Sequence, residues 1–183
     1  MKHLPETSSE DLMRAVAGGD LDAFNEIVLR HREMVWRIAY RFLGDRHAAE
    51  DMAQEAFLRI RDAAPHYRPS AQFRTYLTRV VTRLCLDYVE KRRPDYRKEL
   101  PDVADRGPTG PEQVVAKETQ EIINKALESL PPGQRMAVVL RYLEGLRCGE
   151  AAEAMDVSAK AVERLLAHAR EGLEPQLARL LKK

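Results

Sequence analysis

The sequence predicts an all-α protein made of two small helical domains joined by a flexible linker that contains prolines. Apolar residues recur at helical spacing along most of the 183 residues, and no stretch alternates apolar and polar residues for long, as a strand would. Four prolines and two glycines fall among charged residues between positions 94 and 111, a composition typical of an extended linker. We therefore expect one domain over residues 1–93 and another over residues 112–183.

The first domain is predicted to begin with two helices separated by a glycine pair. A short helix near residues 10–17 ends at Gly18, and Asp20 can cap a second helix that runs to about Leu43. On this second helix, the apolar stripe expected to face the core contains Phe24, Ile27, Val28, Val35, Ile38 and Phe42.

Two further helices follow in the same domain. Gly44 closes the second helix and Asp45 caps the third. The prolines in residues 65–70 predict a loop, because proline disfavours helix in the residue before it, and a fourth helix is expected over about residues 71–91. The stripes expected to be buried contain Met52, Ala53, Ala56, Phe57 and Ile60 on the third helix, and Phe73, Leu77, Val80, Val81, Leu84 and Tyr88 on the fourth.

The second domain ends in a predicted helix-turn-helix. Helices are expected over residues 112–130 and 132–143, followed by a short helix near residues 150–155, a tight turn, and a long helix that Ser158 caps. The second helix of such a motif enters the DNA major groove by its N-terminal residues. An ordinary helical hairpin is the alternative interpretation. The residues expected to be exposed on the long helix are Ala159, Lys160, Glu163, Arg164 and Ala167.

The composition gives no sign of catalysis. The sequence has no glycine-rich phosphate loop, no nucleophile elbow and no zinc-type histidine motif, and its five histidines are scattered. Cys85 and Cys148 match no metal spacing and are expected to be reduced thiols. No apolar run approaches the roughly 18 residues that span a bilayer, and the polar N-terminus does not resemble a signal peptide. We therefore expect a cytoplasmic protein that is not an enzyme and needs no cofactor or metal.

Basic and acidic residues are separated along the chain, although the formal net charge is only +1. Residues 65–93 hold seven arginines and lysines against two acids, whereas residues 45–62 hold five acids against three arginines. A chain with neighbouring basic and acidic faces suits contact with DNA through one face and with a protein through the other.

The fourth helix and the loop before it combine aromatic and basic residues in a way that suits unpaired DNA. Tyr76, Arg79 and Arg83 share a stripe beside the buried one, with Arg74 nearby and Tyr67 in the loop. Arginine neutralises phosphates, tyrosine offers a flat face for base stacking, and the loop is placed to line a pocket for a base turned out of the stack. A solvated basic face is the alternative interpretation of this helix taken alone.

Three segments of the chain resemble the extracytoplasmic-function branch of the sigma-seventy family. Residues 49–57 resemble its Ala-Glu-Asp-x-x-Gln-Glu-x-Phe segment, and the basic helix resembles its promoter-melting helix, with Tyr76 in place of a tryptophan and Arg83 in place of an asparagine. The resemblance covers residues 11–93 and 112–173. The helix-turn-helix resembles the family's promoter-reading domain and departs from its pattern, largely on the DNA side, at Ala151, Ala161, Glu163, Arg164, Leu165 and His168.

The resemblance implies a sigma factor, a subunit that binds core RNA polymerase and directs promoter-specific initiation. It implies a face that docks on the clamp coiled coil of the largest polymerase subunit, formed by Glu50, Asp51, Gln54, Glu55 and Leu58. It implies contacts with the minus-ten element from Tyr67, Arg74, Tyr76, Arg79 and Arg83. In the second domain, Lys160, Glu163 and Arg164 are expected to read bases of the minus-thirty-five element while Arg147 and Ser158 hold its backbone. An anti-sigma protein is a further partner that the resemblance implies, although no residue identifies one.

Two other classes of function compete with this interpretation: a helix-turn-helix regulator that works without polymerase, and an enzyme with an attached DNA-binding domain. The acidic face beside an aromatic and basic helix disfavours the first, and the lack of a catalytic motif disfavours the second. Opening roughly ten base-pair steps costs on the order of 14 kcal/mol, which a few stacked bases at about 1–3 kcal/mol each do not offset. We therefore expect the protein to bind promoters weakly without polymerase.

Overall fold

The computed structural model describes residues 7–69, 72–92 and 123–180, with side chains up to residue 175. All regular secondary structure in these ranges is helical, which confirms the predicted all-α class. The predicted linker and the first part of the predicted helix over 112–130 lie outside the described residues. None of the helices within the described ranges is long and apolar enough to cross a membrane.

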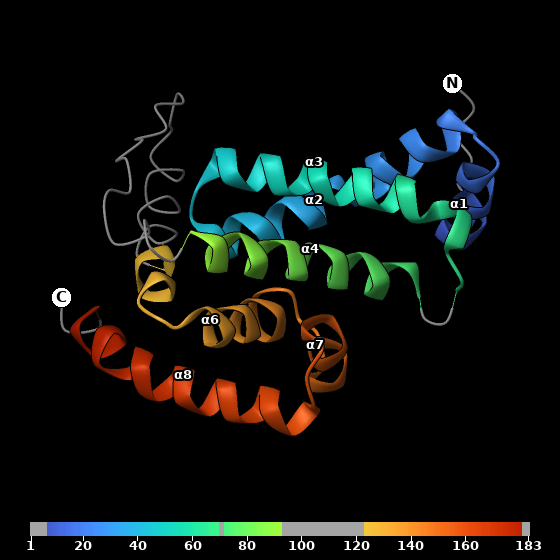
Figure 1. Cartoon of the computed structure of the whole chain (residues 1–183). Coiled ribbons are helices and arrows are strands. Elements are labelled where there is room, and N and C mark those ends of the chain that lie inside the picture. The colour runs from blue at the N-terminus through green and yellow to red at the C-terminus, as the bar shows by residue number, and fades with distance from the viewer. Residues whose placement is uncertain (1–6, 70–71, 93–122, 181–183) are drawn as a thin grey trace.

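The amino-terminal module, meaning the described residues up to 92, is a small helical bundle. Its three long helices lie side by side, each antiparallel to the one before it, and the short first helix packs across one end of the second (Figure 1). The elements are α1 (Ser9–Ala17), α2 (Leu21–Leu43), α3 (Arg46–Ala63), the 3₁₀ turn η1 (Ala64–His66) and α4 (Phe73–Lys91).

Local capping fixes the ends of these helices, as the sequence predicts. The carboxylate of Asp20 accepts from the backbone N–H of Ala23 at 3.0 Å, and that of Asp45 accepts from Ala48 at 2.7 Å. Gly44 ends α2 in the left-handed region, with φ of 72°, which glycine adopts without a steric cost. The cap, the glycine and the short connection together turn the chain from α2 straight into α3.

The loop predicted over residues 65–70 is partly wrong, because residues Ala64–His66 form a 3₁₀ turn. Pro65 is compatible with this turn since the first residues of a helix need no intrahelical N–H donor. The next helix, α4, has no side-chain cap from Gln72; instead a carboxylate oxygen of Glu10 accepts from the backbone N–H of Phe73 at 2.7 Å. Helix α1 therefore holds the start of α4.

The carboxy-terminal module, residues 123–180, is also helical. Residues 123–128 form a helical segment, and α8 then lies across both α6 and α7 (Figure 1). The single helix predicted over 132–143 widens into a π-helical turn, in which the N–H of Glu144 donates to the carbonyl of Val139 five residues back. The elements are α6 (Pro132–Val138), the π turn η2 (Val139–Leu143), α7 (Cys148–Met155) and α8 (Ala159–Leu180).

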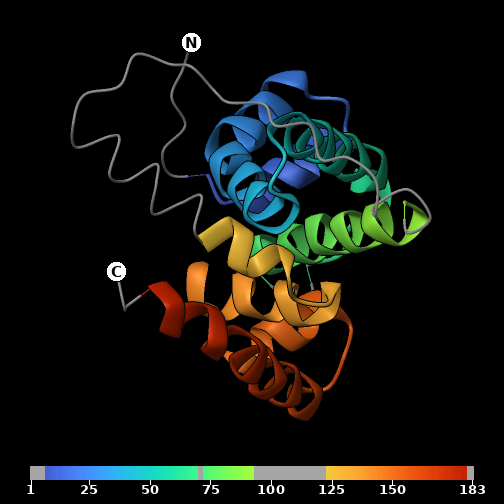
Figure 2. The ribbon, with the colours of Figure 1, turned by 90° about the vertical axis from the view of Figure 1, so that its left-hand side faces the viewer.

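The two modules pack against one another. Helix α4 contacts both α7 and α6, and α2 contacts η2; the two views in Figures 1 and 2 agree on this stacking. Most of the predicted stripes are buried at the core, including Ile27, Phe42 and Leu77. Six residues predicted in these stripes are only half-buried: Phe24, Val28, Met52, Ala53, Val80 and Tyr88.

Candidate functional site

Helix α3 presents an acidic face, the residues Glu50, Asp51, Gln54, Glu55 and Leu58. Asp51, Gln54 and Leu58 are exposed, and Glu50 and Glu55 are half-buried. Positions 51, 54, 55 and 58 follow helical spacing, so they lie together on the side opposite the buried Ala56, Phe57 and Ile60.

Two acids of this face pair with arginines one turn away. Glu50 contacts Arg46 at 3.1 Å and Glu55 contacts Arg59 at 2.8 Å. Leu58 is 43% exposed among these charges. Many protein interfaces have an apolar centre with polar and charged side chains around it. This face has that arrangement, and its acidic groups suit a protein partner with basic groups.

The start of α4 carries a cluster of aromatic rings. The Tyr67 ring lies 5.2 Å from Tyr76 and 6.1 Å from Phe73, between ring centroids. Burial raises the pKa of both tyrosines, and the Tyr67 hydroxyl is buried without a hydrogen-bond partner among the described residues. The two tyrosines predicted to stack on bases are therefore half-buried and rest on each other, rather than standing free in solvent.

The arginines predicted to contact the minus-ten element, Arg74, Arg79 and Arg83, are all exposed along α4. Arg79 pairs with Asp156 of the carboxy-terminal module at 2.9 Å. A cleft of about 780 Å³ lies beside this pair, with Tyr76 and Arg79 on one wall and Val157 on the other. The structure thus brings one predicted minus-ten residue against the turn of the predicted helix-turn-helix.

The helix-turn-helix has the predicted geometry. Asp156 takes the left-handed conformation, with φ of 58°, between α7 and α8, which short polar side chains tolerate. The Ser158 hydroxyl accepts from the N–H of Ala161 at 3.1 Å, so Ser158 caps α8. The predicted base-reading residues Lys160, Glu163 and Arg164 are exposed and line a shallow groove of about 450 Å³ with Ser158 and Ala161. Arg147, predicted to hold the backbone, is exposed at the start of α7.

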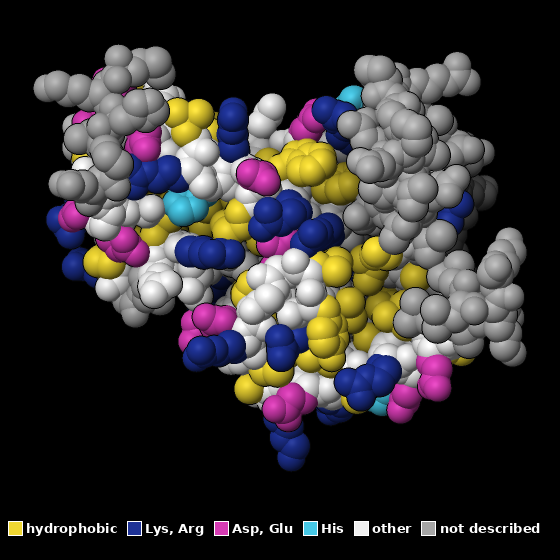
Figure 3. Space-filling view, turned by 180° about the vertical axis from the view of Figure 1, so that it is seen from behind, with side chains coloured by type: hydrophobic (Ala, Val, Ile, Leu, Met, Phe, Trp, Pro, Cys, Tyr) yellow, Lys and Arg dark blue, Asp and Glu magenta, His cyan; other side chains and the backbone are white. Residues whose placement is uncertain are grey.

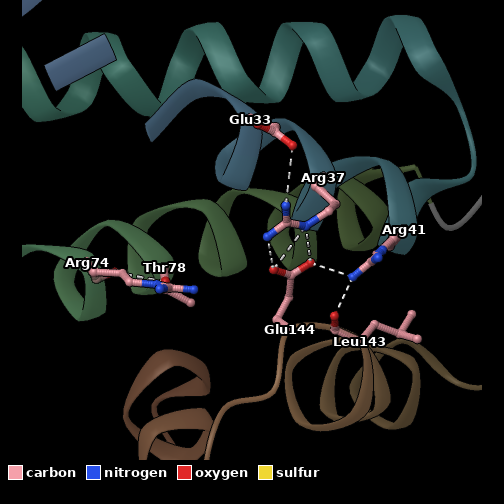
Figure 4. A network of polar contacts seen from close by, with 7 residues as sticks. All are labelled: Glu33, Arg37, Arg41, Arg74, Thr78, Leu143 and Glu144. Atoms are coloured by element: carbon pink, nitrogen blue, oxygen red, sulfur yellow. Dashed lines mark hydrogen bonds and ion pairs between the residues drawn. The ribbon is translucent and has the colours of Figure 1, made fainter. Parts of the chain in front are cut away.

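Sequence reasoning missed an ion-pair cluster between the modules. The Glu144 carboxylate, 1% exposed, lies between Arg37 and Arg41 of α2, with both nitrogen-to-oxygen distances at 2.8 Å (Figure 4). Seen from behind, basic side chains gather around the middle of the molecule (Figure 3). The hydrogen bond from Arg37 to Glu144 raises the pKa of the arginine. The partners are more than 100 positions apart, so no local spacing could have signalled them.

Arg135 is a second residue that the sequence did not single out. It is 5% exposed, and its guanidinium donates to the carbonyl oxygens of Phe42 and Glu128, at 3.1 and 2.6 Å. One arginine of α6 thereby joins the end of α2 to the segment before α6. Within the described ranges, no three His, Cys, Asp or Glu side chains are grouped so that they could hold a metal ion.

Comparison with known proteins matches each module to a region of one protein family. The family model of Sigma-70 region 2 matches residues 27–94, and that of Sigma-70 region 4 matches residues 120–173. The chain is 31% identical to the ECF RNA polymerase sigma factor SigW of Bacillus subtilis, over 90% of this chain and 94% of that one. It is 36% identical to the ECF RNA polymerase sigma factor SigE of Mycolicibacterium smegmatis, over 95% of this chain and 71% of that one.

The fold is similar to that of CnrH in its complex with the cytosolic domain of CnrY. The TM-score is 0.71 at 24% identity, and the match covers 94% of this chain and 99% of CnrH. Two consecutive family matches, the identities and the shared fold agree with the helix-turn-helix and the basic helix described above. The chain belongs to the ECF sigma factors, the extracytoplasmic-function branch of the sigma-70 family.

Proposed function

We propose that this chain docks on core RNA polymerase through the acidic face of α3 and contacts promoter DNA through α4 and the helix-turn-helix. The observation that carries the proposal is the separation of these surfaces: the acidic face lies on the outer side of α3, while the basic residues lie along α4 and at the start of α8. One protein can therefore hold the polymerase and the promoter at the same time. A cytoplasmic location and control by an anti-sigma protein belong to the same proposal.

Charge reversal tests the docking face. The double variant Asp51→Lys and Glu55→Lys should lose most of its affinity for core polymerase. Its stability should change little, since exposed substitutions usually shift the free energy of unfolding by about half a kcal/mol or less. The matched control, Glu171→Lys with Glu174→Lys, makes the same charge change on exposed positions of α8 and should bind core normally. Unaltered core affinity in the α3 variant would refute this docking face.

Tyr76 is proposed to stack on an unpaired base during promoter opening. Tyr76→Ala should slow open-complex formation, and a template with a pre-melted bubble should restore much of the activity. Because the ring packs against Tyr67, the alanine variant also loses a contact within the fold. Tyr76→Phe, which keeps the ring, should melt promoters nearly as well as the wild type. A loss of stability without a melting defect would make Tyr76 a core residue instead.

The helix-turn-helix is proposed to read the upstream promoter element. Glu163→Ala and Arg164→Ala should each relax the preference at one base position, since a good base contact is worth about 1–3 kcal/mol of discrimination. Arg147→Ala should weaken binding to all promoter sequences alike, as the loss of a phosphate contact does. Transcription from a library randomised in the upstream element separates the two effects. The division of roles is wrong if Arg147→Ala alone changes the preferred sequence.

A further inference from the structure

We propose that Glu144 is a latch that holds the two modules in a closed state, in which the helix-turn-helix covers the promoter-facing side of α4. Opening of this latch would release Arg79 from Asp156 and widen the cleft beside Tyr76 for unpaired DNA. The existence of the latch follows from the contacts between modules alone. Its consequence for DNA rests on the proposed function of α4.

The hydrogen bonds of the Glu144 carboxylate depend on the closed state. Arg37 donates to it through Nε and Nη2, at 3.0 and 2.8 Å, and Arg41 donates through Nη1 at 2.8 Å, so both carboxylate oxygens are occupied. The carboxylate is desolvated and its partners all belong to the other module. Removing Glu144 leaves the two arginine charges, which are 35% and 25% exposed, close together without their carboxylate, and this is unfavourable for the closed arrangement. When the modules separate, water solvates all three groups.

Arg41 adds a further link, because it also donates to the backbone carbonyl of Leu143 beside the latch (Figure 4). The π turn before Glu144 brings this carbonyl and the carboxylate to the same side of α2. Two arginines of one helix thus bind two consecutive residues of the other module.

The side of α4 that faces the carboxy-terminal module carries threonines. Thr75 and Thr78 line a cavity of about 300 Å³ together with Glu144 and Leu146. Thr82 continues the same helical stripe, and its hydroxyl is buried without a hydrogen-bond partner among the described residues. Permanent interfaces are usually apolar, whereas interfaces between domains that move are more polar. A threonine stripe therefore suits a surface that spends part of its time in water.

Besides the latch and the bond from Arg135 to the Phe42 carbonyl, another contact between modules involves a residue proposed to bind DNA. Asp156 holds Arg79, and both side chains are about half-exposed, so this pair is weak and screened by salt. A DNA phosphate would compete with Asp156 for the same guanidinium. The acidic face of α3 lies outside this seam and stays accessible in the closed state. Polymerase can therefore dock before the DNA-facing side of α4 is uncovered.

The distance between modules measures the latch directly. Spin labels at Asp62→Cys on α3 and Glu171→Cys on α8, in a Cys148→Ser background, use exposed positions of the full chain. The Glu144→Gln variant should move the distance distribution to longer values, with the ratio of open to closed molecules raised about tenfold or more. The matched control is Glu33→Gln, which removes the outer, 88% exposed partner of Arg37 at 3.8 Å and should leave the distribution unchanged.

Asp156→Asn is a second, milder variant. Asparagine tolerates the left-handed conformation of this turn, so the fold should be kept. We expect a smaller shift than for Glu144→Gln because the Asp156 pair is exposed. Circular dichroism should show the same helix content in all variants. A folded Glu144→Gln protein with the wild-type distance distribution would overturn the latch.

Binding of a fluorescent single-stranded DNA of about 12 nucleotides and mixed sequence to the free protein tests the covering of α4. The apparent Kd should fall in Glu144→Gln by the factor by which the open fraction rises. If the distances lengthen and the Kd does not change, the covering of α4 is wrong. Failure of the proposed function looks different: Tyr76→Ala would then leave promoter opening by the polymerase complex intact, whatever Glu144→Gln does to the distances.

Discussion

Replacing Arg135 by methionine should lower the free energy of unfolding by about 3–5 kcal/mol. The guanidinium is 5% exposed, makes two well-formed bonds to the carbonyls of Phe42 and Glu128, and lies 5.7 Å from the centroid of the Phe42 ring. Each hydrogen bond from a charged donor contributes about 1.5–3 kcal/mol. Methionine fills much of the volume but leaves both carbonyls without this donor, so only part of the loss is offset.

Urea unfolding followed by circular dichroism measures this loss in the free energy of unfolding. The slope of that free energy against urea concentration is compared between the variants. The matched control is Arg32→Met on the exposed side of α2, which should change the stability by about half a kcal/mol or less. A loss below about 1 kcal/mol for Arg135→Met would show instead that these bonds contribute no more than surface contacts.

Three further predictions concern single side chains of the amino-terminal module. Burial lowers the pKa of His31, and neighbouring arginine charges lower it further, so its contribution to stability is present above pH of about 6.5 and is lost as the pH falls through the folded pKa. The variant His31→Gln should flatten this part of the curve of stability against pH. An unchanged slope would contradict this contribution of His31. Burial raises the pKa of Cys85 to about 12, so a thiol reagent at pH 8 should modify only Cys148 in the folded protein and both cysteines in denaturant. Asp45→Ala should cost about 0.5–2 kcal/mol because α3 loses its cap, and a melting temperature equal to that of the wild type would argue against this role.

The ends of the helices could be predicted from the sequence because their causes are local. Asp20, Asp45 and Ser158 accept hydrogen bonds from residues three positions later, and Gly44 needs only its own backbone freedom. The exposed positions of the acidic face and of α8 follow from helical periodicity in the same way. The assignment of these faces to polymerase and DNA stays a prediction, as do the domain boundaries.

The long-range contacts could not be predicted, because they join residues far apart in the chain. Nothing near Glu144 indicates that its partners are Arg37 and Arg41, and nothing near Phe73 indicates that Glu10 caps α4. The half-burial of Tyr76 has a nearer cause, since the rings around it come from the loop and the start of α4. Tertiary packing decides how much of a predicted binding residue is free to bind.

Transcription reconstituted with core RNA polymerase measures whether this chain directs initiation. Core enzyme, the purified protein and a pool of genomic DNA fragments are combined, and the run-off transcripts are sequenced. We expect transcripts that require the protein, that begin downstream of a shared two-part sequence, and that disappear with the Asp51→Lys and Glu55→Lys variant. Transcripts that do not depend on the protein, together with its failure to co-purify with core enzyme, would show that it does not act as a sigma factor.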